Sequence, residues 1–166
     1  MKRSNPDYIL SLLELQLEEF EAYLLSSQLY WQLSMHKAAN AESLRLTTGN
    51  LLLNINDISA RLEQLSEFQK QDFYNLMSIW NRIHRSWLST MQKKALLELN
   101  SRINLWAAYL SDLRDKKDPG EHYKVEIRKR VICSLLAEHT RETSEYDSIH
   151  RKITLLDQQL NQMFQG

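Results

Sequence analysis

Apolar residues recur at steps of three and four along most of the chain, which is the spacing of helices that bury one face. The first stripe follows Asn5 and Pro6, a pair typical of a helix start, and predicts a helix that continues to about His36. Its apolar members are Leu10, Leu13, Leu17, Phe20, Leu24 and Trp31. β-Branched residues are scattered and do not alternate with polar ones, so we expect no strand.

A second stripe, from Leu44 to Leu65, keeps the same 4-3 alternation and predicts a second helix. Asn40 is suited to cap its start, whereas Gly49 weakens its first turns. The helix is therefore expected to begin either at Asn40 or near Asn50.

A third stripe follows Ser66, and Ser66 with Gln69 fits the capping-box pattern of a helix start. The same pattern recurs inside the stripe at Ser89 and Gln92, where a break is the alternative to a continuous helix. We predict one long, kinked helix that ends near Lys116.

The segment 115–121 contains a Pro-Gly pair that a helix does not absorb, and it predicts a turn. Beyond this turn one helix is expected from Glu121 to Phe164. Its stripe is the most regular in the chain, but His139 and Glu142 occupy two of its apolar positions.

These elements predict an all-α fold, an antiparallel bundle of four or five long amphipathic helices with coiled-coil-like packing. A length of 166 residues suits a single helical-bundle domain over residues 1–166. The last two predicted helices are longer than the first two, so part of their apolar surface is expected to stay uncovered.

The chain carries 21 basic and 21 acidic residues, so its formal net charge is zero. Residues 1–72 hold six Lys or Arg against ten Asp or Glu, and residues 73–166 hold fifteen against eleven. This balance argues against a dedicated nucleic-acid binder, which usually has a basic excess. The uneven halves are able to attract each other, within one fold or between copies.

Cys133 is the only cysteine, which excludes an internal disulfide and a cysteine metal cluster. It lies in an apolar helical pattern, so we interpret it as an inert, packed thiol. No run approaches the ~18 apolar residues that a membrane-spanning helix needs. We therefore expect a cytoplasmic protein without a transmembrane segment.

His139 and Glu142 lie three residues apart and share one face of the expected helix. We favour a polar core layer that fixes the helix register, since burying them unpaired would be costly. The alternative is a metal or small-molecule site, to which His84 would add a third ligand. The His-x-x-Glu order differs from the Glu-x-x-His of di-metal bundles, so we predict no cofactor.

The known catalytic motifs are missing from the sequence. It contains no Gly-rich phosphate loop, no GxSxG elbow and no HExxH pair. We therefore assign no catalytic residue and expect a protein that is not an enzyme.

The segment 80–106 interleaves tryptophans with basic residues, a pattern that can bind nucleic acid or anionic membranes. Its tryptophans follow the apolar stripe and its arginines fall away from it, as in a core helix with a solvated face. Binding of nucleic acid or membrane is therefore the weaker alternative. The residues of this basic face are Arg82, Arg85, Lys93 and Lys94.

The leading hypothesis is a non-enzymatic protein that acts through contacts with a protein partner or as a homo-oligomer. The uncovered apolar stripe is expected on the last helix, where it would form the interface. The predicted interface residues are Tyr146, Ile149, Ile153, Leu156, Leu160 and Met163.

Overall fold

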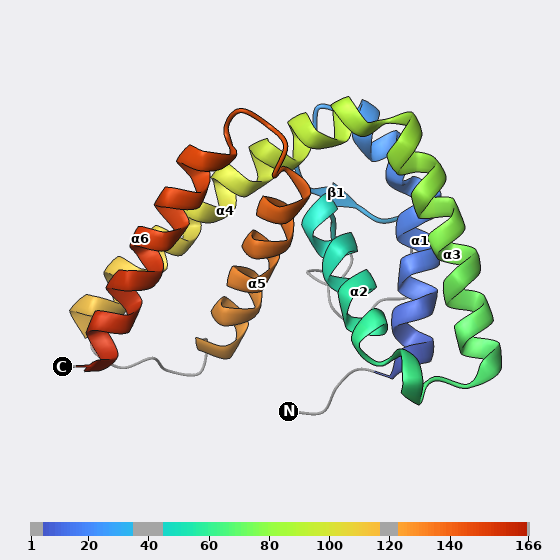
Figure 1. Cartoon of the computed structure of the whole chain (residues 1–166), viewed down its shortest axis with the longest axis horizontal. Helices are drawn as coiled ribbons and strands as arrows, with labels where there is room; N and C mark the ends of the chain where they lie inside the picture. The colour runs from blue at the N-terminus through green and yellow to red at the C-terminus, as the bar shows by residue number, and fades with distance from the viewer. Residues whose placement is uncertain (1–4, 35–44, 117–122, 166) are drawn as a thin grey trace. The chain divides into compact units, whose positions relative to one another are not determined.

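The computed structural model (Figure 1) describes residues 5–34, 45–116 and 123–165. These residues form six α-helices, one short 3-10 helix and one pair of two-residue strands, so the all-α prediction is confirmed. The chain divides into two compact units, Met1–Lys94 and Ala95–Gly166. The sequence pattern, which predicts one domain, gives no sign of this division.

Helix α1, Pro6–Leu25, begins where the sequence predicts. The side-chain oxygen of Asn5 accepts a hydrogen bond from the backbone N–H of Asp7 at 2.9 Å, and Pro6 occupies the first turn. The helix ends at Leu25, however, and the predicted extension to His36 is wrong. The Ser26 hydroxyl donates to the Tyr23 carbonyl and accepts from the Gln28 N–H, and these local bonds compete with the helix.

The chain beyond α1 forms a short strand, β1 (Trp31–Gln32), that pairs antiparallel with β2 (Arg45–Leu46). The sequence predicts no strand here because Trp31 falls in phase with the apolar stripe of α1. Glu19 of α1 fixes this segment by accepting hydrogen bonds from the Trp31 indole at 3.1 Å and from the Ser34 N–H at 3.1 Å. Burial alone would raise the pKa of Glu19, but these hydrogen bonds outweigh it and lower the pKa.

Helix α2, Thr48–Ala60, begins close to the second of the two predicted starts. The Thr47 side chain caps it by accepting a hydrogen bond from the Asn50 N–H at 2.9 Å. Asn40, the other predicted cap, lies outside the described residues. A single 3-10 turn, η2 (Leu62–Gln64), then leads to α3.

Helix α3, Glu67–Ser86, starts with the predicted capping box. The Ser66 hydroxyl accepts from the Gln69 N–H at 3.1 Å, and the Gln69 side chain accepts from the Ser66 N–H at 2.9 Å. Helix α4, Leu88–Lys116, follows after one residue, Trp87. The predicted long helix is thus interrupted at this residue, two positions before the alternative break at Ser89.

Within the first unit, α1 packs against both α2 and α3, and α2 runs in the opposite direction to α1 (Figure 1). α1 and α3 run in the same direction, because contacts join them at both ends. Gln69 donates to the Asp7 carboxylate at 2.8 Å near both N-termini, and the Trp87 indole donates to Glu21 at 3.0 Å near both C-termini. Gln16 and Asn54 form a buried hydrogen bond across α1 and α2.

The second unit contains α4 from Ala95 onward, α5 (Tyr123–His139) and α6 (Tyr146–Gln165). The prediction of one continuous helix from Glu121 to Phe164 is wrong, because the chain turns at residues 140–145. The Thr140 hydroxyl donates to the carbonyls of Leu136 and Ala137, and this satisfies oxygens at the end of α5.

The turn at residues 140–145 allows α6 to fold back, so α6 packs against both α5 and α4. A buried cluster of Trp106, Leu110 and Leu113 on α4 forms the centre of this packing. Its neighbours from α5 and α6 are Tyr123, Ile127, Leu156, Leu160 and Met163. The predicted Pro-Gly turn lies outside the described residues.

Candidate interaction surface

His139 and Glu142, the polar pair expected inside a helix, lie at its end instead. His139 is the half-buried last residue of α5, and Glu142 is exposed in the turn that follows. Neither residue belongs to a polar layer of a continuous heptad helix, because that helix stops between them.

The third candidate ligand, His84, lies on α3 in the first unit, and its ring is 5.7 Å from that of Trp80. Within the described ranges, no three His, Cys, Asp or Glu side chains are grouped closely enough to hold a metal ion. His84 belongs to the first unit and His139 and Glu142 to the second, so the alternative metal site of these three residues stays a prediction.

Cys133 lies buried on α5. Burial is the main reason that the pKa of its thiol rises to about 11. At neutral pH the residue is therefore a protonated thiol, which is a poor nucleophile and a poor metal ligand.

Lys94, which was predicted to lie on an exposed basic face, is buried. Its ammonium group donates to the carbonyl of Tyr23, to the carbonyl of Ser26 at 2.9 Å and to the hydroxyl of Ser26 at 3.0 Å. It also lies 3.9 Å from the centroid of the Tyr23 ring. Burial lowers the pKa of Lys94. The residue ties the start of α4 to the end of α1, where the helix dipole favours a cation.

The rest of the predicted basic face is exposed. Arg82 approaches Glu21 at 3.7 Å, while Arg85 and Lys93 lie at the surface near the junction of α3 and α4. With Lys94 turned inward, no continuous strip of four basic side chains remains.

The predicted interface stripe on α6 faces the interior of its own unit. Ile149 and Ile153 are buried, and Tyr146 is half-buried beside His150, with ring centroids 5.5 Å apart. The other three, Leu156, Leu160 and Met163, pack on the buried cluster of α4. The role of this stripe in association stays a prediction, but its burial is that of an internal core.

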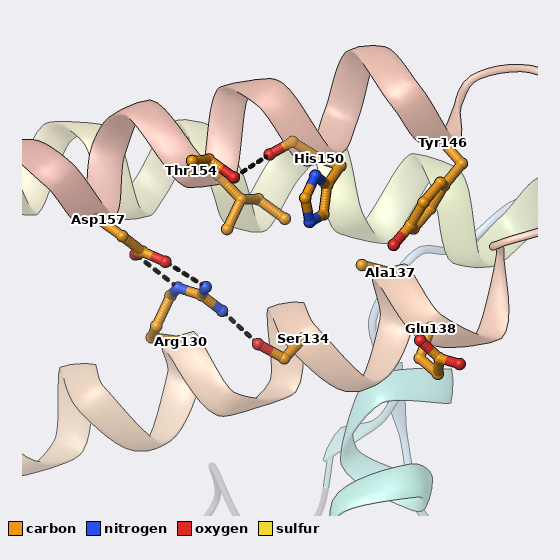
Figure 2. A pocket seen from close by; sticks show the side chains of 9 residues that line it. Arg130, Ser134, Ala137, Glu138, Tyr146, His150, Thr154 and Asp157 are labelled. Atoms are coloured by element: carbon orange, nitrogen blue, oxygen red, sulfur yellow. Dashed lines mark hydrogen bonds and ion pairs between the residues drawn. The ribbon is translucent and has the colours of Figure 1, made fainter.

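A groove of about 260 Å³ separates α5 from α6 (Figure 2). The guanidinium of Arg130 crosses it, donating from Nε to the Asp157 carboxylate at 2.9 Å and from a second nitrogen to the other oxygen. Arg130 also donates to Ser134. The hydrogen bond to Asp157 is the main cause that raises the pKa of Arg130. Because the two charges neutralise each other, we interpret the pair of Arg130 and Asp157 mainly as a contact that holds α6 against α5.

The most unusual surface of the second unit lies on α4, where charged and apolar residues have exchanged their usual places. Glu98 is 0% exposed, and it accepts a hydrogen bond at 2.7 Å from Arg102, whose side chain is only 10% exposed. By contrast, Leu97 is 64% exposed and Leu105 is 60% exposed.

These leucines belong to a continuous uncharged surface, which we call the α4 face. At 3.6 residues per turn its members fall within about 140° of the helix circumference. The structure describes all of positions 95–111, and none of the exposed residues among them is charged. The exposed residues in this range are Leu97, Asn100, Asn104, Leu105, Ala108 and Ser111, with half-buried Ser101 among them.

The sequence pattern did not reveal the α4 face because periodicity does not show that Glu98 and Arg102 turn inward. A signal was present, however. Leu97 and Leu105 lie off the stripe of Leu99 and Ile103, so the helix carries more leucines than its buried side needs.

No described helix is both long and apolar enough to cross a lipid bilayer. Comparison of the chain with protein families, with curated proteins and with solved structures finds no match.

Proposed function

We propose that this chain is a non-enzymatic protein that acts by binding another protein molecule through the α4 face. The observation that supports the proposal is the inverted polarity of α4, in which an ion pair is turned inward and two leucines are turned outward. A helix face that remains in water normally carries charged residues, whereas the α4 face exposes leucine, asparagine and serine side chains without charge, which suits an interaction site.

The chemistry of the α4 face favours protein over the other partners considered. Phosphate groups of nucleic acids and of anionic lipids are bound by exposed Lys and Arg, and the exposed residues of positions 95–111 include neither. Leucine and asparagine side chains suit the apolar centre and the hydrogen bonds of a protein interface.

The size of the expected effect follows from the two leucines. Fully burying a leucine side chain contributes about 1.5–3 kcal/mol, and both residues are still more than half exposed. Covering both would therefore contribute on the order of 2–4 kcal/mol, or roughly 30- to 800-fold in Kd.

The test compares the wild type with the double variant Leu97→Asp/Leu105→Asp, each purified under native conditions and weighed by native mass spectrometry. We expect the wild type above the monomer mass of 19.7 kDa and the variant at that mass. The matched control Leu25→Asp/Leu155→Asp changes two equally exposed leucines outside α4 and should behave as the wild type. A wild type that stays at 19.7 kDa, or a variant that keeps its partner, contradicts the proposal.

A further inference from the structure

We infer that the occupant of the α4 face is a second copy of this chain, with the two α4 helices antiparallel and centred on Ser101. This inference rests on the proposed function and adds to it the identity of the partner and the register of the contact.

The absence of exposed charge on the α4 face favours self-association. In a two-fold dimer the same patch lies against itself, so a residue near the axis faces its own copy, and like charges there would repel. The exposed residues of positions 95–111 are uncharged, and they avoid this repulsion. The side-chain amides of Asn100 and Asn104 both donate and accept hydrogen bonds, so an asparagine of one copy can bond to an asparagine of the other. The zero net charge of the chain removes long-range repulsion as well.

Charges just outside the α4 face select the antiparallel direction. Exposed Lys93 lies one turn before Leu97 on the same helix, and exposed Asp112 lies just after the last exposed residue of the face. A parallel pair would place Lys93 beside Lys93 and Asp112 beside Asp112. An antiparallel pair centred on Ser101 brings each lysine near the aspartate of the other copy.

The two leucines fit the same register. Ser101 lies four residues from Leu97 and four from Leu105, so it is their midpoint both along the helix axis and around it. Turning one copy about Ser101 places Leu97 beside Leu105 of the other copy. The small serine at the centre lets the two helices approach at the 8–10 Å or so typical of packed helices.

Single cysteines introduced into the full-length protein read this register directly. We expect Leu97→Cys mixed with Leu105→Cys to form a disulfide-linked dimer under mild oxidation, and Ser101→Cys to form one alone. Leu97→Cys alone should not, because its two copies would lie about 12 Å apart, beyond the reach of a disulfide. The wild type is the matched control, since Cys133 is buried and its raised pKa of about 11 keeps it protonated.

The outcomes separate this inference from the proposed function when the linked species are weighed by native mass spectrometry and their folding is checked by circular dichroism. A disulfide-linked species of twice 19.7 kDa that forms from Leu97→Cys mixed with Leu105→Cys, but not from Leu97→Cys alone, supports the antiparallel dimer. A dimer that links through Leu97→Cys alone overturns the register. A complex of one copy with a different protein overturns the inference and leaves the proposed function standing. A folded wild type that remains a monomer overturns both.

Discussion

Helices α6 and α4 of the second unit differ in where their charged residues lie, although each exposes leucine, with Leu155 59% and Leu105 60% exposed. On α6 the branched apolar residues Ile149 and Ile153 are buried, while Asp147 and Arg151 are exposed. On α4 the pair of Glu98 and Arg102 is buried, while Leu97 and Leu105 are exposed.

The difference matters because the two arrangements have different consequences for an isolated molecule. Burying apolar side chains and exposing charges, as α6 does, is favourable in a single chain. Burying an ion pair gains little or costs stability, and exposing leucines forgoes the gain of burying them. The arrangement of α4 is therefore best explained if a partner covers the exposed leucines. Four changes test this contrast, beginning with the largest expected effect.

Replacing the buried Ile153 of α6 by aspartate should unfold the second unit. The change places a charge without a partner in the core and removes its packing, which we expect to lower the free energy of unfolding by about 4 kcal/mol or more. Chemical denaturation with hydrogen exchange of α5 and α6 measures the loss. The exposed neighbour Leu155→Asp should leave both unchanged. If Ile153→Asp stays folded and loses only a binding partner, the α6 stripe is the interface after all.

Removing one member of the buried pair on α4 should also destabilise the protein strongly. Glu98→Ala leaves the guanidinium of Arg102 in a mostly buried position without this carboxylate, at a cost of about 3 kcal/mol. The double change Glu98→Leu/Arg102→Leu should recover much of this loss, because neither charge of this pair is then left buried without the other. Urea denaturation of the three proteins decides the matter. A fully stable Glu98→Ala variant would mean that the pair is solvated and that α4 is an ordinary surface helix.

Changing Lys94 to methionine should lower stability by a smaller amount at neutral pH. The carbonyls of Tyr23 and Ser26 each lose one hydrogen-bond donor, which we expect to cost about 1–3 kcal/mol. Thermal unfolding measures the effect, and the exposed neighbour Lys93→Met is the control. Equal stability of both variants would show that Lys94 is solvated.

The pH dependence of the free energy of unfolding provides a second test of the burial of Lys94. Burial lowers its pKa below the ordinary value of 10.5, so the unfolded chain binds more protons at this residue than the folded chain. The free energy of unfolding should therefore rise as the pH increases from the folded pKa towards 10.5, and Lys94→Met should remove this rise. An unchanged slope in the variant contradicts the burial of this ammonium group.

The smallest effect on stability is expected on the α4 face itself. Leu97→Asp/Leu105→Asp changes exposed residues, so the monomer should unfold within about 0.5 kcal/mol of the wild type. The measurement is denaturation at a concentration low enough for the wild type to be a monomer. A large loss there would place the two leucines in the internal core.

Much of the fold was predictable where the signal is local. Asn5 and Pro6 mark the start of α1, and Ser66 with Gln69 marks the start of α3, because capping bonds join residues two or three apart. The break at Thr140 was missed because the apolar spacing continues through it, and a threonine that bonds to carbonyls three and four residues earlier also occurs inside helices. The strand at Trp31 was missed because its partner, Leu46, lies far along the chain.

The candidate surface was less predictable than the fold. Periodicity places Glu98 beside the buried Leu99, at the edge of the stripe, and does not decide whether its carboxylate turns inward. Arg102, one turn later on the same helix, is a local partner, but the burial of the pair depends on the helices packed nearby, which is a tertiary feature. The same limit applied to Lys94, whose position at the end of α1 no local pattern reveals.

The most direct test of the account is the rate at which a maleimide labels Leu105→Cys as the protein concentration rises. Between about 1 and 200 µM, where a small dimer interface forms, the rate should fall because a second copy covers residue 105. Labelling of Leu155→Cys, on the solvated side of α6, should stay constant over the same range. A rate at residue 105 that does not change with concentration, in a protein that remains folded, would contradict the claim that the α4 face binds a second copy.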